Sequence, residues 1–158
     1  ALAEQCYFAV CRRLLWALGV VAEVLVFMAM SRIFARFSVR KVLLASFVLA
    51  ALRWLLLGNL ADIPAVLVFA QVLHAATFGC FHAAAIAFVQ ASFGARQQGQ
   101  GQALYAALSG TGGALGALYS GYSWKLLGPH FTFGMASVAA LAAAVIIAFR
   151  LKDSRNHP

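Results

Sequence analysis

The chain has 158 residues and a net charge of +8, with 64% hydrophobic but only 10% charged residues. Soluble domains contain about 45–50% apolar and 25% charged residues, and a chain of this size buries only roughly 70% of its surface on folding. A soluble enzyme and a nucleic-acid-binding module are therefore excluded. The basic residues lie in short runs between apolar blocks, a pattern typical of membrane-protein loops, so no nucleic-acid partner is expected.

Five apolar blocks are long enough to cross a bilayer, because a spanning helix needs about 20 mostly apolar residues. The predicted helices cover residues 14–34, 42–60, 64–93, 103–127 and 131–149. The connections are short and contain turn-forming residues, including Pro64 and the Gly128-Pro129 pair, so that neighbouring helices are antiparallel. The predicted fold class is an all-α membrane protein with five transmembrane helices.

The distribution of basic residues predicts the orientation of the helices. Eight lysines and arginines flank one side of the predicted bundle: Arg32, Arg36, Arg40, Lys41, Arg96, Arg150, Lys152 and Arg155. Three flank the other side: Arg12, Arg13 and Lys125. We therefore place residues 1–13 outside as an N-terminal segment, residues 14–152 in the membrane and residues 153–158 in a cytoplasmic tail. Five spans with an external N-terminus indicate a fragment of a larger protein.

Several polar side chains fall inside the predicted spans, where an ionisable residue costs roughly 2.5–3.5 kcal/mol on insertion scales. Glu23 and His74 each lie ~14–15 Å along their helices from the same membrane face, and Arg53 lies ~10 Å from it, at 1.5 Å of rise per residue. Gln71 and His82 share a broad face with His74. These five residues are the candidate solute- and proton-binding site.

Alternative interpretations exist for each of these positions. Arg53 could extend to the interface beside Trp54, and His82 could be a histidine hydrogen-bonded between helices. Glu23 could be neutral and hydrogen-bonded to a serine or a carbonyl group. Small residues repeat every four positions within 103–127, which suits either close helix packing or movement of one helix against another.

No cofactor, metal site or enzymatic activity is expected from the sequence. His74, Cys80 and His82 do not share one helix face, and no second group has metal-ligand spacing. Cys6 and Cys11 could pair, although two cysteines five residues apart are weak evidence. Sequence motifs of hydrolases and nucleotide-binding loops are absent.

Several segments together resemble the major facilitator superfamily. They are Leu15 to Val24, the basic turn Arg32 to Lys41, Ala51 to Trp54, and Gln71 to Gly79. More closely, they are similar to the 3-phenylpropionic-acid transporter group, which is related to lactose-permease-like proton symporters. The similarity extends from about Leu14 to Arg150.

This resemblance implies that the five helices are the eighth to twelfth of a twelve-helix transporter. It implies that 14–34, 64–93 and 103–127 line a central cavity, which 42–60 and 131–149 support. Lactose-permease-like members carry a carboxylate, an arginine and a histidine on the eighth, ninth and tenth helices. Glu23, Arg53 and His74 match these positions, and His82 matches less closely.

Two functions follow as hypotheses. The first is a fragment of a secondary transporter in a bacterial-type inner membrane, carrying a small organic solute such as an aromatic carboxylate together with protons by alternating access. Its partners are the solute, protons, the lipid bilayer and a missing N-terminal transporter half. The second is a non-transporting membrane or assembly protein, including an inert truncated product.

Overall fold

The computed structural model describes the backbone of residues 2–151 and the side chains of residues 13–151. Within this part of the chain the elements are all helical, without strands. They are α1 (Leu2–Arg36), α2 (Val39–Leu60), α3 (Pro64–Ser92), the short 3₁₀ helix η1 (Ala95–Gln97) and α4 (Gln98–Arg150). The predicted tail 153–158, Lys152 and the side chains of Cys6, Cys11 and Arg12 lie outside the described residues.

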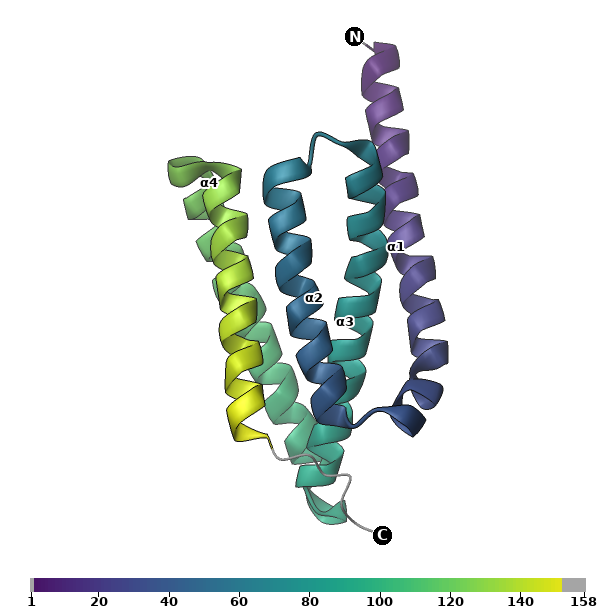
Figure 1. Cartoon of the computed structure of the whole chain (residues 1–158), viewed down its shortest axis with the longest axis vertical. Helices are drawn as coiled ribbons and strands as arrows, with labels where there is room; N and C mark the ends of the chain where they lie inside the picture. The colour runs from purple at the N-terminus through teal and green to yellow at the C-terminus, as the bar shows by residue number, and fades with distance from the viewer. Residues whose placement is uncertain (1, 152–158) are drawn as a thin grey trace.

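Four of these helices are long and apolar enough to cross a membrane. The predicted helices 103–127 and 131–149 correspond to the two limbs of the element α4, which bends sharply between them. At Gly128 the backbone leaves helical geometry, with φ 81° and ψ 175°, a conformation that glycine adopts without steric cost. Figure 1 shows α4 turning back on itself at this point, so that its two limbs lie alongside each other.

The first helix begins earlier than the apolar block that predicts it. The expected helix 14–34 extends to Leu2 at its start and to Arg36 at its end, whereas the part apolar enough to span a membrane is Arg13–Arg36. Residues 1–13 contain neither glycine nor proline to end a helix. The predicted N-terminal segment is therefore helical from Leu2 and continuous with the first span.

The other helix boundaries have clear local causes. Ser38 caps α2, because its side-chain oxygen accepts a hydrogen bond from the Lys41 amide at 3.4 Å. Pro64 begins α3, in the first turn, where its missing N–H costs nothing. Between α3 and η1, Gly94 has extended backbone geometry. These short connections make α2 antiparallel to both α1 and α3, so that α1 and α3 run in the same direction (Figure 1).

The helices pack in the order α1, α3, α2, α4, which differs from their order in the sequence (Figure 1). α2 and α4 are in close contact at two positions along their lengths. Ser137 donates a hydrogen bond to the carbonyl oxygen of Ala51 at 3.0 Å, and a Cβ atom on Gly58 would lie 3.0 Å from the Cβ of Phe133. The second limb of α4 is thus held directly against α2.

The end of the bundle that carries the basic turn also contains its best-packed apolar cluster. Met30, Val42, Leu43 and Ala84 are buried together there. Arg40 donates a hydrogen bond of 2.7 Å from Nη2 to the carbonyl oxygen of Ala148, in the last turns of α4. A cation at a helix C-terminus satisfies a free carbonyl group and interacts favourably with the helix dipole.

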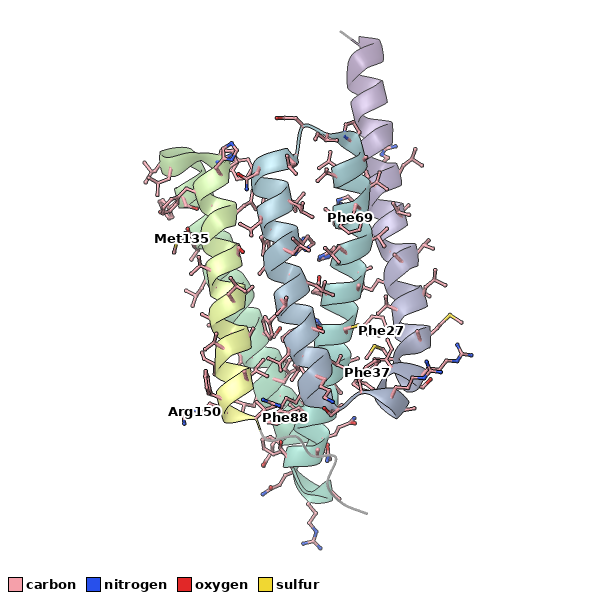
Figure 2. All side chains as sticks on the ribbon, viewed as in Figure 1. Phe27, Phe37, Phe69, Phe88, Met135 and Arg150 are labelled. Carbon is pink, nitrogen blue, oxygen red and sulfur yellow. The ribbon has the colours of Figure 1, made fainter. Side chains whose placement is uncertain are left out.

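Large apolar side chains cover the outside of the bundle. Figure 2 shows Met135 on α4 and Phe69 on α3 among the side chains that project from the helices, and these two are 42% and 54% exposed. Leu118, Leu126 and Phe149 are more exposed still. This surface suits a lipid environment, where apolar side chains have no reason to avoid contact with their surroundings.

Candidate functional site

A cavity of about 310 Å³ lies between α1, α2 and α3 and brings together four of the five predicted site residues. Glu23 comes from α1, Arg53 from α2, and Gln71 and His74 from α3. The rest of the lining is Trp16, Gly19 and Val20, all on α1. The cavity therefore collects a carboxylate, a guanidinium, an amide and an imidazole from three helices.

Helical periodicity explains why these residues meet. One face of α1 carries Trp16, Gly19, Val20 and Glu23. Trp16 lies three residues before Gly19 and four before Val20, and Glu23 follows these two by four and three residues, which is the spacing of one helix face. On α3, Gln71 and His74 are three residues apart. Since α3 packs between α1 and α2, its face reaches both Glu23 and Arg53.

Two nitrogen atoms in this site lack a protein partner. Arg53 is only 9% exposed, and its Nε atom is buried without a hydrogen bond. Nδ1 of His74 is buried without a partner as well. Leaving such a group unsatisfied costs about 1–3 kcal/mol. Both nitrogen atoms are therefore polar groups that the described residues leave unpaired in this arrangement of the helices.

The charged groups of the site also act on one another. His74 is within electrostatic range of both Arg53 and Glu23. Arg53 is in addition held by its neighbour in the sequence, because its guanidinium carbon lies 3.9 Å from the centre of the Trp54 ring. A cation–π contact of this kind stabilises a buried guanidinium without using up its hydrogen-bond donors. Arg53 is thus buried and fixed, with Nε left free.

His82 lies apart from the other four predicted residues and does not line the cavity. Its Nδ1 is 3.2 Å from the carbonyl oxygen of Phe78, one turn back on α3. Its ring lies 4.1 Å from that of Phe78 and 6.1 Å from that of Tyr105 on α4, between ring centres. Eight residues of helix, ~12 Å at 1.5 Å per residue, separate it from His74.

Sequence reasoning missed Trp16 and Gly19, because it searched the spans for ionisable groups. The sequence nevertheless contained the signal. Trp16 lies seven residues before Glu23, and Gly19 lies four residues before Glu23, which is the spacing of one helix face. The resemblance also implied that 42–60 only supports the cavity, whereas Arg53 of α2 lines this one.

Four glycines of the pattern on α4 do not pack closely against the described helices. A Cβ atom added at Gly110, Gly112, Gly113 or Gly116 would meet nothing within 4 Å in this structure. Close packing through a glycine occurs at other positions, including Gly58 on α2 and Gly79 on α3. A Cβ atom on Gly79 would lie 3.1 Å from Cγ1 of Val26 and 3.9 Å from Cγ of Glu23.

Gly79 therefore sets the distance between α1 and α3 beside Glu23, and its replacement has a testable effect. Because overpacking costs about 1–3 kcal/mol, Gly79→Val is expected to lower the melting temperature of the detergent-solubilised chain by several degrees. The matched control is Gly134→Val, where an added Cβ meets nothing within 4 Å. Circular dichroism measures the melting temperatures. Equal values for the two variants would contradict this role of Gly79.

In the part of the chain that the structure describes, no three His, Cys, Asp or Glu side chains are grouped so that they could hold a metal ion. Comparison with known proteins identifies the family of the chain. The family model described as "MFS_1 like family" matches residues 6–135. No solved structure matches the chain.

A curated relative gives the family a biological context. The chain is 35% identical over 130 residues to the "Probable 3-phenylpropionic acid transporter" of Escherichia coli (strain K12). The alignment covers 82% of this chain but 34% of the relative, so the chain spans only a part of that protein's length. The relative is named as a transporter and not as an enzyme. With most of its length matched by the family model, the chain belongs to the MFS_1-like family of membrane transport proteins.

Proposed function

We propose that this chain is the C-terminal part of a proton-coupled symporter that carries a small organic carboxylate by alternating access. The observation that carries the proposal is the polar cavity between α1, α2 and α3. It contains a buried arginine and a half-buried histidine, each with one nitrogen atom that has no protein partner. Polar and ionisable groups inside a membrane protein usually mark the path of a solute or an ion.

Each residue of the cavity has a role in this mechanism. Arg53 binds the carboxylate group of the solute, because a guanidinium offers several donors that match a carboxylate. Gln71 donates a further hydrogen bond. Glu23 and His74 take up and release the proton, since both line the cavity together with Arg53. A solute anion that neutralises the arginine changes the charge around them.

The solute class follows from the cavity and from the relative. Trp16 lies on the same side of α1 as Glu23 and gives the cavity an aromatic wall, which suits a solute with an aromatic ring. The named relative is a probable transporter of 3-phenylpropionic acid, a molecule that combines a ring with a carboxylate. We therefore propose an aromatic carboxylate such as 3-phenylpropionate.

The proposed topology has five spans, with each limb of α4 crossing the membrane once. The Gly128 bend and the loop 61–63 then face outward. The basic turn between α1 and α2, Arg96 and Arg150 face the cytoplasm, as the positive-inside rule requires. A bacterial-type inner membrane is the proposed location.

Transport of this kind needs two halves that rock around a site at the midplane. The unpacked glycine face of the first α4 limb suits contact with a missing N-terminal half, because small residues allow helices to approach closely.

Uptake of radiolabelled 3-phenylpropionate, with and without a pH gradient, tests the proposal. Cells express this chain alone or extended by the coding sequence upstream of it. We expect gradient-driven uptake from the extended protein and none from the chain alone. Absence of uptake in both, with both proteins present in the membrane, would contradict the substrate. If a wider panel of organic acids is not transported either, the alternative of a non-transporting or inert membrane protein gains support.

A further inference from the structure

A second and much larger cavity, of about 1010 Å³, lies between α2 and the two limbs of α4. Its lining includes Trp54 of α2, Trp124 and Lys125 of the first limb, and Phe133 and Ala136 of the second. The polar cavity shares none of these residues. The Gly128 bend joins the two limbs of α4 at one end of the bundle (Figure 1).

The walls of this cavity are mostly apolar, and the serine and threonine hydroxyls that line it are already hydrogen-bonded. Thr132 donates a hydrogen bond to the carbonyl oxygen of Gly128 at 2.9 Å and lies 2.9 Å from the hydroxyl of Ser123. Ser120 donates to the carbonyl oxygen of Ala117 at 3.2 Å. Hydrocarbon is therefore the chemistry that this lining favours, since an apolar cavity gives water too few partners.

One charged group breaks this apolar pattern. Lys125 lines the cavity three residues before the bend, so it is ~4.5 Å from the end of the limb at 1.5 Å per residue. Among the described residues its ammonium group has no hydrogen bond or ion pair. It stands next to Trp124, half of whose surface is exposed, and tryptophan is enriched at the headgroup level of membranes.

We propose that this cavity binds an anionic phospholipid, with its acyl chains between the limbs of α4 and its phosphate on Lys125. Size and charge both favour this occupant. The cavity reaches the upper end of the usual range for ligand sites, ~300–1,000 Å³, and a small aromatic acid would leave most of it unfilled. Lys125 matches the phosphate of a phospholipid, and the apolar space between the limbs matches its acyl chains.

Quenching of tryptophan fluorescence by brominated lipids tests this site directly. The chain has three tryptophans, and a Trp16→Phe background leaves the two that line the cavity. We expect brominated phosphatidylglycerol to quench them at a roughly fivefold lower mole fraction than brominated phosphatidylcholine, the effect of one lysine near a membrane surface. Lys125→Gln is expected to remove this preference, and Lys125→Arg to keep it.

A second pair of variants separates the cavity from the general lipid shell. Ala136→Phe narrows the cavity and is expected to weaken quenching by both lipids. Ala114→Phe adds the same ring to α4 at an exposed position that does not line the cavity and is expected to leave quenching unchanged.

Four results would overturn the proposal: equal quenching by the two lipids, a preference that persists in Lys125→Gln, relief of quenching by 3-phenylpropionate, or relief by raising the protein concentration. The last two would assign the cavity to the transported solute or to a second copy of the chain. No gradient or transport enters the assay, so it stands or falls separately from the transport function.

Discussion

Replacing Arg53 by glutamine is expected to lower the affinity for 3-phenylpropionate by about 30-fold or more, because a buried charge contact is worth roughly 2–5 kcal/mol. Arg53 is the buried cation of the polar cavity, and glutamine keeps a hydrogen-bond donor while removing the charge. Equilibrium binding of the labelled solute to the membrane-embedded extended protein measures the change. The loss should be larger for carboxylates than for the corresponding alcohol, 3-phenylpropanol, which carries no charge.

Arg32→Gln is the matched control for this experiment. It removes the same charge from an exposed position in the last turns of α1, far from the cavity lining, and is expected to bind the solute like the parent protein. A similar loss in both variants would point to a general effect of charge on the protein. If Arg53→Gln binds the acid as tightly as the parent, Arg53 is not the carboxylate-binding residue.

Replacing Glu23 by glutamine is expected to separate solute movement from the proton gradient. Glutamine has nearly the same shape as glutamate but carries no titrating proton, so the solute can still bind and exchange. A gradient of one pH unit drives about tenfold accumulation per coupled proton, since each tenfold ratio corresponds to ~1.4 kcal/mol. In Glu23→Gln the accumulation ratio should fall towards one, while exchange of labelled for unlabelled solute at equal pH continues.

Glu23→Asp keeps the titrating group and should retain part of the accumulation. The decisive measurement is the pair of assays in the same vesicles, gradient-driven uptake and exchange at equal pH. Loss of both would show that Glu23 is needed for binding or folding. Normal accumulation in Glu23→Gln would assign the coupling proton to another group, of which His74 is the nearest candidate in the cavity.

The helices could be predicted from the sequence because hydropathy sets where a helix can span a bilayer. The start of α1 could not be predicted in this way, because the apolar block and the helix have different limits. The thickness of the bilayer determines the length of the apolar block, whereas capping and helix-breaking residues determine where the helix begins and ends. The Gly128-Pro129 pair correctly marked a reversal, because the backbone between the two limbs of α4 leaves helical geometry at Gly128.

The polar cavity could be predicted in part, because depth along a helix can be counted from residue numbers. That argument gave Glu23, Arg53 and His74 comparable depths, and all three line one cavity. It could not show that His82 would face the rings of Phe78 and Tyr105 instead. Which helices become neighbours is decided by packing, including close approaches such as that of Gly79 to Val26.

Trp54 connects the two cavities of the molecule. Its ring lies under the guanidinium of Arg53 and stacks on Phe133, 5.6 Å between ring centres, while it also lines the large cavity. Whatever fixes this indole also fixes the arginine, and thermodynamic linkage makes such an effect reciprocal. An occupant of the large cavity that holds this indole in place would therefore also stiffen the arginine of the polar cavity, so that a single side chain couples two sites that share no lining residue.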